Sequence, residues 1–276
     1  MIGRLCPVVT AVLVLAASGP AQAVAAAQPV PETMAALGDS ISTGFNSCGW
    51  YVSCGSRSWA AGDNTQVSSH YLRLRRLAGT LQRENYAVPG ATSADLLGQV
   101  EKAIAAKADY VTILIGAQDA CKRTEREMTP VSVYRQRLDA ALGALRAGMP
   151  LARVFVASVP DLRRLWQVGK DSPIARTFWT IGKICQTMLA DPASTKKADD
   201  ERRARVRARV MAYNREAAGA CAAMGPACDT DEGAIFSFPF TLDHVSKWDF
   251  FHPNLSGQRA LAEQTFKHGF SWIDPR

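Results

Sequence analysis

Short uncharged segments rich in β-branched residues alternate with amphipathic segments along this chain, and this alternation constrains the fold most. The clearest uncharged segment, residues 110–115, reads Tyr-Val-Thr-Ile-Leu-Ile and stops at Gly116. Its composition is typical of a central strand that is covered on both faces. Residues 34–37, 86–88 and 154–157 are expected to be further strands, the second of them weaker.

Helical periodicity occurs between the expected strands. Residues 93–104 begin with a serine cap and place leucines, valine and isoleucine on one face, residues 130–148 repeat the pattern after a proline, and residues 256–266 form a third helix. Strands that alternate with helices predict an α/β fold with a parallel central sheet. Ligands bind beyond the carboxyl ends of such strands. The turns at 38–40, 89–90 and 116–119 are therefore expected to lie side by side.

The chain has 276 residues, of which 47% are apolar and 21% charged, and this composition excludes intrinsic disorder. No Pro/Gly/Ser-rich linker divides it, so one domain over residues 34–276 is expected, after a short tail at 24–33. A basic segment, residues 196–209, carries an excess of positive charge. Apolar residues continue through it at helical spacing, which favours the solvated side of an amphipathic helix over nucleic-acid binding.

The first residues have the pattern of a secretory leader. Arg4 precedes an apolar run at 5–17, and Ala21-Gln22-Ala23 follows as a small-x-small cleavage site. We expect a signal peptide at 1–23, cleaved near Ala23, and a secreted, extracellular protein. The apolar run is well short of the roughly 20 residues that span a bilayer, and no later segment is longer and as apolar, so stable membrane insertion is not expected. A monomer is expected.

Removal of residues 1–23 would remove Cys6 and leave an even number of cysteines in an exported chain, where disulfides persist. Proximity in sequence favours two small loops and leaves a third pair, so that the expected bridges are Cys48–Cys54, Cys121–Cys185 and Cys221–Cys228. A zinc site is disfavoured, because the chain lacks a C-x-x-C pair with a nearby histidine at ligand spacing.

Two segments carry residue types suited to hydrolysis. Asp249 lies three residues before His252, and Pro253 follows, so this histidine is expected on a loop where the carboxylate reaches Nδ1. A capped helix start with an incidental histidine is the simpler alternative. Ser40 follows the first expected strand, where it is either a nucleophile or only a turn residue. The chain has no G-x-S-x-G elbow, H-E-x-x-H motif or Walker A motif.

Four segments in order resemble the conserved blocks of the SGNH (GDSL) hydrolases. They are Gly38-Asp39-Ser40-Ile41, Gly90 within residues 87–93, Gly116-Ala117-Gln118-Asp119 and Asp249-Phe250-Phe251-His252-Pro253. Residues 44–51, 69–73 and 164–169 are similar to secreted actinobacterial members.

The resemblance implies a flavodoxin-like three-layer α/β/α sandwich and ester hydrolysis without a metal or organic cofactor. Ser40 matches the nucleophile, His252 the general base and Asp249 its orienting carboxylate. Ser40 and Gly90 match the backbone oxyanion donors. A serine hydroxyl needs such a base, and the tetrahedral oxyanion needs fixed donors.

The third block departs from the family pattern. The family has Gly-x-Asn-Asp, whose asparagine amide is the third oxyanion donor, and this chain has Gln118. The main interpretation is a serine esterase or lipase acting on carboxylic esters. The alternatives are a polysaccharide deacetylase on the same fold, and an extracellular binding protein weakened in catalysis by Gln118. Six aromatic residues are candidates for a lipid-facing groove or for core: Trp50, Tyr51, Trp59, Trp166, Phe178 and Trp179.

Overall fold

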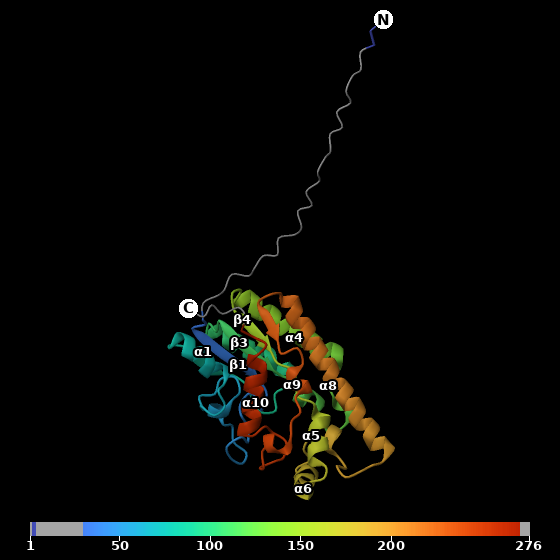
Figure 1. Ribbon diagram of the computed structural model, residues 1–276. Helices are drawn as coiled ribbons and strands as arrows, with labels where there is room; N and C mark the ends of the chain where they lie inside the picture. The colour runs from blue at the N-terminus through green and yellow to red at the C-terminus, as the bar shows by residue number, and fades with distance from the viewer. Residues whose placement is uncertain (1, 4–29, 271–276) are drawn as a thin grey trace.

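The computed structural model describes residues 2–3 and 30–270 and forms a five-stranded sheet with helices on both faces (Figure 1). Most of the expected signal peptide and most of the expected tail lie outside the described residues. The strands are β1 (Thr33–Gly38), β2 (Gln82–Asn85), β3 (Tyr110–Leu114), β4 (Arg153–Val156) and β5 (Cys228–Thr230). The α-helices are α1 (His70–Ala78), α2 (Leu96–Ala105), α3 (Ala117–Ala120), α4 (Val131–Gly148), α5 (Leu162–Gly169), α6 (Pro173–Ile181), α7 (Gln186–Leu189), α8 (Lys197–Met224), α9 (Ala234–Ser237) and α10 (Leu255–Phe266).

The sheet has the order β2-β1-β3-β4-β5, and each neighbouring pair is parallel. This is the flavodoxin-like order, in which the chain crosses from one side of β1 to the other. All five residues of β3 are buried, as expected of a strand covered on both faces. The expected α/β fold with a parallel sheet is therefore confirmed.

The second strand differs from the expectation. Residues 82–85 form β2, whereas the expected segment 86–88 continues past it as a non-strand extension that still bonds to β1 through Tyr86 N–H to Ala36 O at 2.9 Å. An edge strand with one solvated face tolerates the polar sequence Gln-Arg-Glu-Asn, which carries no apolar signal. The three-residue β5 was missed for the same reason.

The helices cover both faces of the sheet. Helices α2, α4 and α8 pack together on one face, and α1 and α10 lie on the other (Figure 1). On the second face His70 of α1 contacts Tyr110 of β3 and Phe155 of β4. Its Nε2 lies 2.7 Å from Thr265 Oγ1 of α10. Burial lowers the pKa of His70 to about 3, so this histidine is a neutral core residue.

The basic segment lies on α8, which buries Val206, Val210 and Tyr213 and leaves its charged side chains exposed or half-buried, in agreement with the amphipathic interpretation. Arg203 is the exception, because it is buried and donates to the carbonyl oxygen of Asp191 at 2.7 Å. Within the described residues no helix is both long and apolar enough to cross a membrane.

The three expected disulfides are present: Cys48–Cys54, Cys121–Cys185 and Cys221–Cys228. The first closes a loop after β1, the second joins the end of α3 to the start of α7, and the third joins α8 to β5. Two of the bridges therefore hold segments that follow the carboxyl ends of strands β1 and β3.

Candidate active site

The turn after β1 places Ser40 at the carboxyl end of the sheet. Gly38 adopts φ 134°, and a Cβ there would lie 2.0 Å from the carbonyl oxygen of Leu114, so only glycine fits. Gln99 of α2 bonds to both backbone groups of Gly38, at 2.7 and 2.9 Å. Gln258 of α10 donates to the carbonyl oxygen of Ile41. Helices from both layers thus fix the two sides of Ser40.

Ser40, His252 and Asp249 form a continuous hydrogen-bonded chain. Ser40 Oγ lies 2.8 Å from His252 Nε2, and His252 Nδ1 lies 2.5 Å from Asp249 Oδ2. Ser40 is 4% exposed and Asp249 6% exposed, so both polar groups lie in a largely desolvated setting. The contact joins residues that are 212 positions apart in the chain.

The loop that carries Asp249 and His252 is folded around the carboxylate. Val245 pairs with Pro253, and Ser246 N–H donates to the carbonyl oxygen of His252 at 2.8 Å. Asp249 Oδ1 accepts hydrogen bonds from the backbone N–H groups of Phe251 and His252, at 2.9 and 3.0 Å. The spacing of three residues therefore forms a turn in which the Asp249 carboxylate contacts both the backbone N–H and the imidazole of His252.

Asp249 remains ionised in this setting. Burial by itself raises the pKa of Asp249, but the hydrogen bond and charge of His252, followed by the Phe251 N–H and the Asn46 amide, outweigh it and hold the pKa below its usual range. An ionised carboxylate bonded to Nδ1 fixes the imidazole tautomer that leaves Nε2 free to accept a proton.

A second buried carboxyl adjoins Ser40 in the turn after β1. Burial raises the pKa of Asp39 to about 7, and the negative charge of Asp119 adds to the rise, while the Ile41 N–H and the charge of His252 oppose it. Asp39 Oδ2 has no hydrogen-bond partner among the described residues. Asp119 instead accepts from the backbone N–H and hydroxyl of Ser93, which ties the second and third family blocks together.

The other candidate site residues are placed less tightly. Gly90 lies in an exposed turn with φ 85°. Gln118 is half-buried on the short helix α3, and its side chain makes no hydrogen bond with another described residue. The backbone N–H groups of Ser40 and Gly90 likewise donate to no acceptor in residues 30–270.

An apolar pocket opens beside Ser40 and His252. Its walls come from the turn after β1, from α5 and from the segment before α10, and they include Leu162, Leu165, Val168, Phe240, Val245 and Phe251. Ala117 also lines the pocket, but Gln118 and Gly90 do not. Two of the six aromatic candidates, Trp59 and Trp179, are core residues, whereas Trp50 and Tyr51 are 59% and 78% exposed.

Sequence reasoning missed Asn46, Asp39 and Asp119 as parts of this site. Asn46 donates from Nδ2 to Asp249 Oδ2 at 2.7 Å across 203 positions of sequence. No local pattern marks such a contact. For Asp39 and Asp119 the signal was present, because both lie in the family blocks at strand ends that were expected to meet.

The fold is that of the SGNH hydrolases. A family model described as the GDSL-like lipase/acylhydrolase family matches residues 36–260. The chain belongs to this family, whose members hydrolyse esters, and the resemblance inferred from the four blocks is confirmed at that level.

Solved structures with the same fold are distant in sequence. A lipase from a goat rumen metagenome is 14% identical, with a TM-score of 0.56 over 88% of this chain and 99% of its own. A phospholipase A1 from Streptomyces albidoflavus is 19% identical, with a TM-score of 0.52 over 86% and 98%. A family two carbohydrate esterase from Clostridium thermocellum is 13% identical, with a TM-score of 0.51 over 87% and 64%. A comparison with curated protein sequences finds no match.

Proposed function

We propose that this chain is a secreted serine esterase of the lipase type, which hydrolyses carboxylic esters through an acyl-enzyme. The observation that carries the proposal is the hydrogen-bonded chain from Ser40 Oγ through His252 to the Asp249 carboxylate. A serine hydroxyl is a weak nucleophile until an adjacent base removes its proton. His252 Nε2, at 2.8 Å, is within reach of that proton.

In the proposed reaction Ser40 Oγ attacks the ester carbonyl carbon while its proton moves to His252 Nε2. Asp249 stabilises the imidazolium that forms and keeps its Nδ1–H directed at Oδ2. The tetrahedral intermediate collapses when His252 returns the proton to the leaving alcohol oxygen. A water molecule then repeats the sequence on the acyl-enzyme and releases the carboxylic acid.

The proposed oxyanion donors are the backbone N–H groups of Ser40 and Gly90; Gln118 occupies the position of the third donor, but its extra methylene group misplaces the amide. Support comes from the two unpaired backbone donors and from the tie between Ser93 and Asp119, which holds the second and third blocks together. Donors aimed at the developing charge are the largest single source of acceleration in such sites. The Gln118 side chain needs to move or order itself to take part, because no described residue anchors its amide.

The walls of the pocket favour an apolar acyl chain. Leucine, valine and phenylalanine side chains line it, and burial of each methylene group contributes about 0.8 kcal/mol. A polysaccharide deacetylase, the alternative on this fold, has to seat a large polar sugar beside the serine, which this pocket does not favour.

Export is proposed from the leader pattern, with cleavage near Ala23, and three disulfides support it. Disulfides persist in oxidising compartments and are rare in the cytosol.

A panel of three substrate types tests the proposal: nitrophenyl esters of short acids, nitrophenyl esters of long acids, and acetylated xylan. We expect hydrolysis of both nitrophenyl series, with kcat/KM rising from acetate to medium-length chains. Activity confined to acetylated xylan would favour the deacetylase. A folded protein that hydrolyses none of them would favour a binding protein.

A further inference from the structure

A disulfide closes part of the segment after Ser40. The Cys48–Cys54 bridge closes the ring of residues 48–54, and residues 44–54 together are here named the disulfide loop. Within the loop, Asn46 N–H donates to the carbonyl oxygen of Val52 at 2.9 Å and Cys54 N–H donates to that of Gly44 at 3.3 Å. Arg57 donates from Nη1 to the carbonyl oxygen of Ser47. The bridge and the hydrogen bonds define one conformation for the backbone at Asn46.

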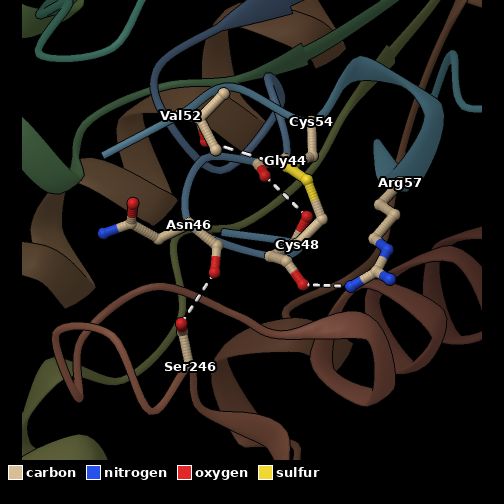
Figure 2. The surroundings of a disulfide bond; sticks show 8 residues. Gly44, Asn46, Cys48, Val52, Cys54, Arg57 and Ser246 are labelled. Carbon is tan, nitrogen blue, oxygen red and sulfur yellow. Dashed lines mark hydrogen bonds between the residues drawn. A yellow bond between two sulfur atoms is a disulfide. The ribbon is translucent and has the colours of Figure 1, made fainter. Parts of the chain in front are cut away.

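Asn46 turns its side chain away from the disulfide (Figure 2) and toward Asp249. It is 3% exposed and adopts φ 56°, the left-handed region that asparagine tolerates better than most residues. Its Nδ2 donates to Asp249 Oδ2 at 2.7 Å. Its Oδ1 has no partner among the described residues, so the contact with Asp249 is the one hydrogen bond that this side chain makes there.

Ser246 forms a second link between the same two loops. Its hydroxyl donates to the carbonyl oxygen of Asn46 at 2.7 Å (Figure 2). Its backbone N–H donates to the carbonyl oxygen of His252, and its carbonyl oxygen accepts from Phe250 N–H, both at 2.8 Å. The disulfide loop is therefore bonded to the backbone and to the carboxylate of the loop that carries Asp249 and His252.

We propose that Asn46 is a positioning residue for Asp249 and that the Cys48–Cys54 bridge keeps it in place; this inference rests on the proposed function. The two backbone N–H groups hold Asp249 Oδ1, while Asn46 and His252 both donate to Oδ2. With both oxygens held, the carboxylate plane cannot rotate away from the imidazole. Without the Asn46 donor, the His252 bond is the only one among the described residues that fixes Oδ2.

The bridge matters because a positive φ is costly for a side chain and needs surrounding structure to persist. Opening the bridge would leave the hydrogen bonds of the disulfide loop alone to hold Asn46. The bridge itself does not line the pocket beside Ser40. Its effect on catalysis is therefore expected to pass through Asn46 and Asp249, and to appear in kcat with little change in KM.

Two single variants test the side chain. Asn46→Gly removes the donor and accepts the positive φ without strain. We expect kcat to fall on the order of tenfold to a hundredfold, the range of a hydrogen bond to a charged group, with KM little changed. Asn46→Asp keeps the shape but sets a carboxylate against Asp249, and a fall at least as large is expected. The low-field proton NMR signal of the His252 Nδ1–H should shift or broaden in both variants.

A matched pair of double variants tests the bridge. Cys48→Ser/Cys54→Ser and Cys221→Ser/Cys228→Ser open loops of nearly equal sequence separation, 6 and 7 residues, so the loss of loop-closure entropy is nearly equal. We expect kcat to fall only in the first pair. Adding Asn46→Gly to the first pair should lower kcat by less than the product of the two separate effects.

The outcomes separate this inference from the proposed function. If the wild-type protein cleaves esters and Ser40→Ala does not, but Asn46→Gly keeps the wild-type kcat and the His252 proton signal, Asn46 has no positioning role. Equal losses of kcat in the two cysteine pairs would overturn the role of the bridge. A folded wild-type protein without any esterase activity would count against the proposed function instead.

Discussion

Replacing Asp39 with asparagine should stabilise the protein at neutral and alkaline pH and leave its stability nearly unchanged at pH 4. The side chain is fully buried beside Ser40, and burial is the main reason that its pKa is raised from 3.8 to about 7. Asparagine has nearly the shape of the protonated carboxyl. It also retains an oxygen that accepts from Ile41 N–H, now at 2.9 Å.

The direction of the pH dependence follows from whether the folded or the unfolded state binds the proton of Asp39. Between pH 3.8 and about 7 the folded state keeps the proton of Asp39 while the unfolded state has lost it, so the free energy of unfolding falls as pH rises. Each pKa unit corresponds to about 1.36 kcal/mol. The rise of the pKa from 3.8 to about 7 therefore gives a loss of about 4 kcal/mol that is complete above pH 7.

Urea unfolding of the wild type and of Asp39→Asn at pH 4, 6 and 8 measures this difference. The stability of the variant relative to wild type should rise across the series and level off above pH 7. Asp243→Asn changes an exposed carboxylate and serves as the control, with a difference that hardly depends on pH. A gain for Asp39→Asn that is as large at pH 4 as at pH 8, or a loss at pH 8, would refute the reasoning.

Three further perturbations have defined outcomes. Asp249→Asn should lower kcat on the order of 10⁴-fold with the fold intact, because the amide favours the wrong imidazole tautomer; circular dichroism and ester kinetics check this, and near-normal turnover would indicate a Ser-His dyad. At position 118, Gln118→Asn should raise kcat. Gln118→Ala should lower kcat far less than the roughly 10²- to 10³-fold that removal of an oxyanion donor costs. A large drop of kcat in both variants would show that glutamine is the adapted donor. Cys121→Ser/Cys185→Ser opens the bridge with the largest sequence separation, 64 residues, and should cost roughly 4 kcal/mol of unfolding free energy in urea titrations; a cost no larger than that of opening a short loop would contradict the entropic account.

The sequence predicted the central strands well because their signal is local. Residues 110–115 carry an uncharged β-branched run that suits burial on both faces, and the structure has β3 there with every residue buried. The edge strands gave no such signal. β2 has the sequence Gln-Arg-Glu-Asn, which contains no apolar residue. It is a strand because it pairs with β1 at the edge of the sheet, and its composition does not indicate this pairing.

The candidate site also contains contacts that a local sequence pattern predicts and contacts that it does not. The approach of Asp249 to His252 Nδ1 follows from a spacing of three residues on one turn, so sequence reasoning could anticipate it. The contact of Asn46 with Asp249 joins residues 203 positions apart and depends on a positive φ just before the ring that Cys48–Cys54 closes. A single sequence without related sequences does not reveal such a contact.

The elevated pKa of Asp39 was also beyond the sequence, although the residue lies in the first family block. Its pKa depends on how completely the packed chain excludes water from the turn after β1. Only the packed structure shows that burial is complete and that Oδ2 is left without a partner among the described residues.

The most direct test of the proposed nucleophile is covalent labelling of the intact, oxidised protein with a serine-directed fluorophosphonate, followed by peptide mass spectrometry. We predict a single adduct, on the peptide that contains Ser40, together with loss of ester hydrolysis in proportion to labelling. Ser40→Ala should take up no label and should retain almost no activity, while its thermal unfolding stays close to that of wild type. An adduct on another serine, with Ser40→Ala still hydrolysing esters, would contradict the account.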